Sequence, residues 1–202
     1  MILAAPARQI IRMAPQVLRW AKPDAIITDV GSTKREIAAA YRGAKRFVPG
    51  HPMAGTERAG IEAADPNLFT GSSWTNWVLG WRRTKDHVSV VNLVYALGAS
   101  PCPLAPEHHD RLVAFTSHLP YVLALLLVQG MAGRDGLVGG SFRSATRVAA
   151  QPPAMGLDIL LTNRFNIARE AERMARSLSK VAVLLRKGNE KALRRLIEDG
   201  KP

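Results

Sequence analysis

Apolar and polar residues in the first 80 positions form short apolar runs separated by segments with helical spacing. Apolar runs at residues 1–5 and 25–30 predict two buried strands, and residues 46–49 predict a third. Residues 7–21 carry apolar side chains at roughly helical spacing, and residues 32–36 resemble the capped start of a second helix. This alternation is typical of an α/β fold built on a doubly wound sheet.

The pattern changes after a last strand candidate at residues 74–81. Helical spacing dominates residues 86–97, 106–130 and 153–186. The last segment carries a narrow apolar stripe made of Ile167, Ala171, Met174, Leu178, Val181 and Leu185. Such a stripe must pack on another surface. It can pack on the chain's own core or on a second subunit, and the sequence leaves both open.

The change of pattern near residue 80 predicts two domains. Residues 1–80 are expected to form a partial dinucleotide-binding, Rossmann-like domain, and residues 81–202 an all-α helical domain for substrate binding and dimerisation. A complete Rossmann domain begins with a strand and a Gly-x-Gly-x-x-Gly turn that binds pyrophosphate at a helix N-terminus. The chain lacks that motif. It therefore resembles the back half of a doubly wound sheet in an N-terminally shortened chain.

Composition narrows the class of protein. A hydrophobic content of 47% and a charged content of 22% are ordinary for a soluble globular chain. The net charge of +12 is spread along the sequence without any nucleic-acid motif, so we expect no nucleic-acid partner. The longest apolar run near the middle, residues 119–128, contains a proline and is too short to span a membrane.

The single cysteine, Cys102, excludes an internal disulfide and a cysteine zinc site. No metal-ligand spacing is present, so we expect no metal.

The N-terminus has too short an apolar run for a signal peptide and no basic region before it. A cytoplasmic location is therefore expected.

Candidate chemistry is concentrated in residues 50–57, where His51 and Glu57 lie among glycine, proline and other small residues. Small residues let the backbone approach a ligand and leave an imidazole uncrowded. Upstream, residues 26–34 run from an apolar strand into a glycine turn with a hydroxyl group and a cation. Side chains that follow neighbouring strand ends are how α/β enzymes assemble their sites.

Several motifs together resemble the prephenate/arogenate dehydrogenase family, which makes the precursor of tyrosine. The matching blocks are residues 2–6, 28–34, 50–57, 106–111, 117–120 and 142–149. They occur in the family's order and at similar spacing, and the resemblance ends at about residue 163. It implies an oxidoreductase that binds NAD or NADP and oxidatively decarboxylates a cyclohexadienol, prephenate or arogenate. It also implies a homodimer formed mostly by the helical domain.

The resemblance implies a role for individual residues. His51 matches the histidine that takes the proton of the ring 4-hydroxyl as hydride leaves, and Ser32 matches a serine that orients the same hydroxyl. Arg147 matches an arginine that pairs with a substrate carboxylate, a task suited to a planar guanidinium. Two further sets match: Thr56, Glu57 and His118 line and close the substrate pocket, and Ala5, Pro6 and Ser32 contact the cofactor.

Structural roles remain open for the same residues. Ser32 could be a helix N-cap, Glu57 a first-turn residue, and His118 a buried histidine satisfied within an apolar helix. Arg143 lies four residues before Arg147, and the second is favoured as the ligand. His108 and His109 are interpreted as part of a helix N-terminus rather than a site.

The chain also departs from the family pattern. Tyr121 stands where a second histidine or glutamine is common, and Gly156 and Leu157 stand where a tryptophan and a basic residue are common. Ser144 and Ala145 replace a common aspartate. These changes leave prephenate and arogenate both open as substrates. The alternative function is a catalytically inactive, truncated paralogue that binds a small anion or acts as a dimer partner.

Overall fold

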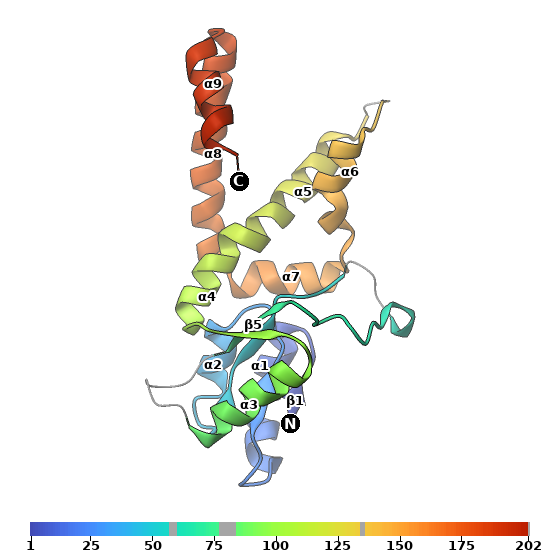
Figure 1. The fold of residues 1–202 in the computed structure, drawn as a ribbon, viewed down its shortest axis with the longest axis vertical. Coiled ribbons are helices and arrows are strands. Elements are labelled where there is room, and N and C mark those ends of the chain that lie inside the picture. The colour runs from blue at the N-terminus through green and yellow to red at the C-terminus, as the bar shows by residue number, and fades with distance from the viewer. Residues whose placement is uncertain (57–59, 77–83, 134–135, 202) are drawn as a thin grey trace.

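The computed structural model describes residues 1–56, 60–76, 84–133 and 136–201. An α/β part lies at one end of the molecule, and two helical arms extend away from it and diverge (Figure 1). Helix α7 crosses the base of the arms, between them and the α/β part (Figure 1). An α/β N-terminal part followed by a helical region, as the sequence predicts, is confirmed.

The first sheet has three parallel strands in the order β1-β2-β3. Its elements are β1 (Ile2–Leu3), α1 (Ala7–Trp20), β2 (Ile27–Asp29), α2 (Arg35–Ala40) and β3 (Phe47–Val48). Ile10, Ala14 and Val17 lie three to four residues apart on α1, so one helical face is buried. This face packs with Leu3, Ile27, Ile37 and Tyr41 into one core. The two edges of β2 are paired, which places its C-terminal end at the middle of the sheet.

A second three-stranded sheet follows, which the sequence did not predict. Its strands are β4 (Gly50–Pro52), β5 (Ser73–Asn76) and β6 (Ser100–Pro103). Strand β4 pairs antiparallel with β5, and β5 pairs parallel with β6. Helix α3 (Lys85–Ala96) connects β5 to β6, and the short 3₁₀ turn η1 covers Ile61–Ala63. The expected histidine loop is therefore a strand, and the strand expected at 74–81 is described only as far as Asn76 because residues 77–83 lie outside the described part.

The position where the packing changes differs from the expected boundary at residue 80. Strand β6 pairs with β5, and Val94 of α3 packs against Trp74 in the core of the second sheet. Residues 85–103 therefore lie with the α/β part. The helical region begins at Pro106, a residue whose fixed φ suits the first turn of a helix.

One helix runs from Pro106 to Gly130. It consists of α4 (Pro106–Val113), a single π turn η2 (Ala114–His118) and α5 (Leu119–Gly130). Single π turns inside α-helices often occur at functional sites, and this one ends at His118. By length and composition this helix could cross a membrane, but a core helix passes the same test. Its buried polar residues His109, Asp110 and His118 pack against the rest of the chain.

The segment expected as one helix over residues 153–186 is two helices. After α6 (Gly140–Thr146) and the 3₁₀ turn η3 (Arg147–Ala150), the chain forms α7 (Pro153–Thr162), α8 (Arg164–Arg186) and α9 (Glu190–Asp199). The break occurs at Asn163, whose backbone leaves helical geometry while its side-chain amide donates to the Asp110 carbonyl. Helices α6 and α9 were not predicted.

The apolar stripe on α8 is covered only near its start. Ile167 is buried against Ala114 and Ile159, whereas Leu178 and Leu185 are 56% and 62% exposed. This half of α8 extends away from the α/β part, with α9 beside it (Figure 1). The described part of the chain therefore does not bury the outer half of the stripe.

Candidate active site

A cavity of about 500 Å³ lies where the α/β part meets the helical region. Five of the residues expected in the substrate site line it together: Ser32, His51, Thr56, His118 and Arg147. They come from the end of the first sheet, strand β4 and its following loop, the π turn and η3. Glu57, the sixth expected residue, lies outside the described part of the chain.

A second cavity of about 310 Å³ adjoins the first. Its lining includes Ala5, Pro6 and Ser32, the three residues expected to contact a cofactor. Ser32 lines both cavities, as do Val30, Met155 and Ile159. Residues 4–7 and 30–32 of the lining follow the carboxyl ends of β1 and β2, which is where ligands bind in open α/β sheets, and the other lining residues belong to α7.

His51 is held by strand pairing rather than by a loop. It lies opposite Thr75 in the β4–β5 ladder, and the Thr75 hydroxyl donates to the His51 carbonyl at 3.3 Å. The preceding position must be glycine, because a Cβ on Gly50 would lie 2.9 Å from the indole nitrogen of Trp74 and 3.0 Å from the Asp29 carbonyl. This close approach sets the path of β4 and so the position of the imidazole.

A buried ion pair ties β4 to the end of the first sheet. Asp29 accepts hydrogen bonds from the backbone N–H groups of Gly31 at 2.9 Å and Gly50 at 3.1 Å, and it pairs with the ammonium of Lys34. Lys34 also donates to the Gly50 carbonyl at 2.5 Å. Burial lowers the pKa of Lys34, and Asp29 opposes that effect. The pair therefore fixes the glycine turn and the start of β4 together.

His51 contacts a second histidine that the sequence analysis did not place in the site. His51 Nδ1 lies 2.8 Å from His109 Nε2, and His109 Nδ1 lies 2.9 Å from Asp110 Oδ1. His109 and Asp110 are 0% and 1% exposed. Burial lowers the pKa of His51 well below 6.5, and neighbouring His109 and Lys34 lower it further. His51 is therefore a neutral base over the physiological range.

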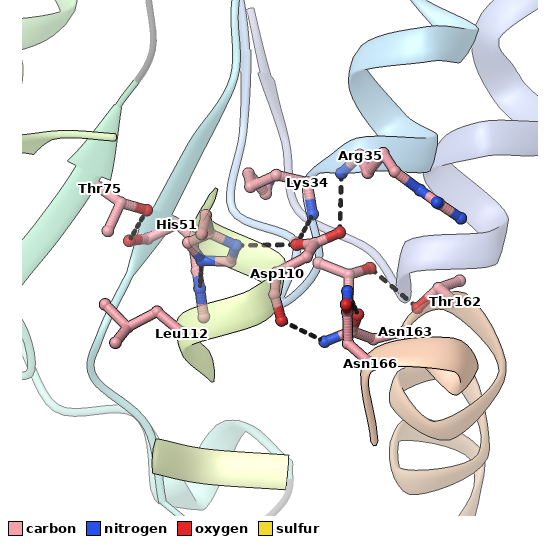
Figure 2. Close-up of polar contacts among 12 residues, drawn as sticks. Lys34, Arg35, His51, Thr75, Asp110, Leu112, Thr162, Asn163 and Asn166 are labelled. Atoms are coloured by element: carbon pink, nitrogen blue, oxygen red, sulfur yellow. Dashed lines mark hydrogen bonds and ion pairs between the residues drawn. The ribbon is translucent and has the colours of Figure 1, made fainter. Parts of the chain in front are cut away.

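Asp110 also caps helix α2. Its carboxylate accepts from the backbone N–H of Lys34 at 2.7 Å and of Arg35 at 3.0 Å (Figure 2). An acidic group at a helix N-terminus satisfies N–H groups that have no partner within the helix. The alternative role of Ser32 as the N-cap is therefore wrong: Lys34 precedes α2, and the capping side chain comes from α4.

His118 is both buried and at the cavity wall. It is 2% exposed, and its Nδ1 lies 3.1 Å from Asn163 Nδ2. The same amide nitrogen donates to the Asp110 carbonyl at 2.7 Å (Figure 2). Because the Asn163 amide nitrogen is a donor, His118 Nδ1 must accept, and a neutral His118 carries its proton on Nε2. Burial is the main cause that lowers the pKa of His118 to about 4, with Asp110 acting in the opposite direction.

The two candidate arginines differ in position. Arg147 begins η3 and lines the first cavity, whereas Arg143 is an exposed residue of α6 that lines neither cavity. The cavity therefore has a guanidinium at one side and the His51 imidazole in its wall. This arrangement can hold a carboxylate and accept a proton within one ligand.

The role of His109 and Asp110 was missed because neighbouring residues on a helix point in different directions. His108 is exposed and His109 is fully buried. The only sequence signal was a histidine and an aspartate together in a helix just before the Ser-His-Leu-Pro motif. The described residues contain no group of three or more His, Cys, Asp or Glu side chains that could hold a metal ion.

Comparison with known proteins covers almost the whole chain. Residues 1–97 match the family model for the nucleotide-binding domain of prephenate dehydrogenase, and residues 105–199 match the model for its dimerization domain. The prephenate dehydrogenases of Lactococcus lactis and Bacillus subtilis are 31% and 30% identical to it over 99% of its length. The chain spans 58% and 57% of these relatives.

A solved structure of the prephenate dehydrogenase from A. aeolicus, in complex with hydroxyphenyl propionate and NAD+, has the same fold. The TM-score is 0.88 at 29% identity, over 98% of this chain and 72% of that one. The two domain models occur in the same order as the two structural parts described above. The chain belongs to the prephenate dehydrogenase family.

Proposed function

We propose that this chain forms the substrate site and the nicotinamide side of an NAD(P)-dependent oxidoreductase that oxidatively decarboxylates prephenate or arogenate. The observation that carries the proposal is the joint lining of one cavity by His51 and Arg147, with Ser32 shared by the adjoining cavity. This reaction needs a group that accepts a proton, a group that binds a substrate carboxylate, and a second cavity for the cofactor. The family assignment supports the same reaction.

The second cavity suits a nicotinamide nucleotide. Ala4, Ala5 and Gly31 leave its floor without bulky side chains, so that a flat ring can approach the strand ends. Ser32 at the shared border puts a hydroxyl between the cofactor side and the substrate side. When bound there, NAD or NADP supplies the acceptor for the hydride that leaves C4 of the substrate ring.

The chain's own residues move one proton, orient one hydroxyl group and hold one carboxylate. As hydride leaves C4, His51 accepts the proton of the 4-hydroxyl at the ring nitrogen that faces the cavity. The bond from C1 to the carboxylate carbon then breaks, its electron pair makes the ring aromatic, and carbon dioxide departs. His51 can return the proton to the resulting phenolate oxygen, so no net proton is consumed. Ser32 is positioned to orient the hydroxyl, and Arg147 to hold the side-chain carboxylate of the substrate.

We also assign the exposed part of the helical region to a homodimer interface. The exposed apolar side chains on α8 need a partner surface, and residues 105–199 match a dimerization domain. We propose that the protein is a soluble, cytoplasmic biosynthetic enzyme with no nucleic-acid or membrane partner. Among the described residues, the helix over residues 106–130 is long and apolar enough to cross a membrane, and burial between subunits accounts for that composition as well as a membrane would.

The test is carried out with the protein, prephenate and arogenate in turn, and each of NAD and NADP. Formation of reduced cofactor is followed by absorbance, and binding of hydroxyphenyl propionate by calorimetry. His51→Gln should lower kcat by about 10²-fold or more while analogue affinity is retained. Arg147→Ala should weaken analogue binding about tenfold or more because a charge-assisted pair is lost. Arg143→Ala, four residues away, is the matched control.

Unchanged analogue affinity in Arg147→Ala would remove that residue from the substrate site. Full turnover in His51→Gln would remove the histidine from the chemistry. Reduced cofactor formed with only one of the two substrates would decide between prephenate and arogenate.

A further inference from the structure

We propose that His109 and Asp110 are positioning residues that hold His51 in the tautomer with its proton on Nδ1, so that Nε2 faces the cavity as a proton acceptor. The effect of this tautomer on catalysis rests on the proposed function. The tautomer itself follows from the contacts and can be measured without any turnover.

The positions of the protons on the two imidazole rings can be assigned in turn, beginning from the Asp110 carboxylate. A carboxylate can only accept hydrogen bonds, and Asp110 accepts them from the backbone of Lys34 and Arg35 as well as facing His109 Nδ1 at 2.9 Å. His109 Nδ1 must therefore carry a proton. In a neutral imidazole the other nitrogen is then an acceptor. His109 Nε2 is that acceptor, and it lies 2.8 Å from His51 Nδ1.

The order continues to His51. Because His109 Nε2 accepts a hydrogen bond, His51 Nδ1 must donate it. The single ring proton of a neutral His51 is therefore on Nδ1. Its Nε2 is left with a lone pair. An imidazole with the opposite tautomer would present an N–H to the cavity and could not take a proton from a substrate hydroxyl. The burial that keeps His51 neutral keeps this lone pair available.

Both ring nitrogens of His109 are engaged. The ring is fully buried, with His51 at Nε2 and Asp110 at Nδ1. Asp110 in turn cannot rotate away, because it holds the first N–H groups of α2 from a different part of the chain. The anchoring carboxylate is thus fixed by the fold rather than by substrate.

His118 gives an internal reference with the opposite proton position. The Asn163 amide nitrogen donates toward His118 Nδ1, so its proton is expected on Nε2. The cavity is then lined by one imidazole acceptor, His51, and one imidazole donor, His118. The two assignments depend on different partners, and a change at His109 should move only the first.

The experiment uses the whole chain labelled with ¹⁵N-histidine, and nuclear magnetic resonance reads which ring nitrogen is protonated. Signals are assigned by their loss in His51→Gln and His118→Gln. The native protein should show His51 with its proton on Nδ1 and His118 with its proton on Nε2. A His51 protonated on Nε2, or a His109 protonated on both nitrogens, would overturn the proposal.

Two substitutions at His109 separate positioning from structural support. His109→Asn keeps a donor near Asp110 but removes the acceptor for His51, whereas His109→Gln keeps an acceptor within reach of His51. We expect His109→Asn to populate the Nε2–H form of His51 and to lower kcat about 10²-fold with KM little changed. His109→Gln should retain more kcat, and His108→Asn, on the exposed side of α4, should behave as native.

Equal kcat in native protein and folded His109→Asn would overturn the positioning role. The inference is separable from the proposed function. The predicted tautomers in a native protein that oxidises neither prephenate nor arogenate would support the proton order and refute the reaction.

Discussion

Asp158 on helix α7 and Arg8 on helix α1 join the helical region to the α/β part through one carboxylate. The Arg8 backbone N–H donates to Asp158 Oδ2 at 3.1 Å, and its guanidinium Nε donates to Oδ1 at 2.6 Å. The Asp158 side chain is 8% exposed and that of Arg8 is 43% exposed. Asp158 therefore serves as the missing N-terminal cap of α1, which has no capping side chain of its own.

We predict that Asp158→Ala lowers the free energy of unfolding by about 1 kcal/mol or slightly more, the usual effect of losing an N-terminal cap. Urea unfolding followed by circular dichroism measures the change. Arg8→Ala is the matched control, because it removes the exposed guanidinium but keeps the backbone donor. It should cost less, since half-exposed ion pairs contribute little. Equal losses in the two variants would show that the backbone contact is not the stabilising one.

Gly156 is where α7 leaves room for Tyr121 of α5. A Cβ at residue 156 would lie 2.1 Å from the Tyr121 hydroxyl and 2.8 Å from its Cζ atom. Tyr121 is 8% exposed, so the ring has little freedom to move aside. The two departures from the family pattern at these positions are therefore one matched change, in which a missing side chain on α7 accommodates a larger one on α5.

We predict that Gly156→Ala destabilises the protein by about 1–3 kcal/mol through overpacking. The cost should shrink in a Tyr121→Leu background, and a double-mutant cycle in urea measures the coupling. Gly130→Ala is the control, because a Cβ there meets open space at the end of α5. Additive losses in the cycle would contradict the proposed pairing.

The sequence predicted the elements whose residues carry a strong local pattern. The buried face of α1 and the long helix from Pro106 follow from apolar spacing, which depends on neighbours only three or four residues away. The break at Asn163 was missed because local apolar spacing does not mark it. The Asn163 side chain contacts the Asp110 carbonyl, 53 residues distant in sequence. The second sheet was missed because its strands, of three or four residues, carry too few positions for a period to show.

In the candidate site, too, residues marked by a local sequence pattern were predicted and residues that depend on distant contacts were not. His51 stood out because glycine and proline surround it, and five expected residues do line one cavity. Asp110 could not be recognised, because its role is to cap a helix from another part of the chain and to orient His109. Those relations exist only after the two parts pack together. The roles of the lining residues in substrate and cofactor binding are predictions.

Protonation of buried histidines should make the fold sensitive to acid. The pKa of His118 is lowered to about 4 in the folded chain, against about 6.5 when unfolded. Between these values the unfolded state binds more protons, so the free energy of unfolding should fall as the pH drops from about 7 to about 4. This histidine contributes on the order of 3 kcal/mol to that loss.

Urea unfolding at successive pH values measures the slope. His118→Gln should flatten the dependence in this window, with a residual slope from His51, whose pKa is also lowered by burial. His108→Gln should retain the native slope, because its side chain is exposed. A native slope in His118→Gln would show that folding does not lower the pKa of this histidine.

The outer half of α8 provides the last prediction. Leu178 and Leu185 lie seven residues apart on one face, and their side chains are more than half exposed in the single chain. Glutamate at such a face would place a charge in an apolar contact between subunits. We predict that Leu178→Glu shifts the protein from dimer to monomer at micromolar concentration, as measured by sedimentation or light scattering. Leu137→Glu, at a fully exposed loop position, is the control. A Leu178→Glu protein that remains dimeric would place the interface on another face, and a native protein that is monomeric would leave this stripe without the partner assigned to it.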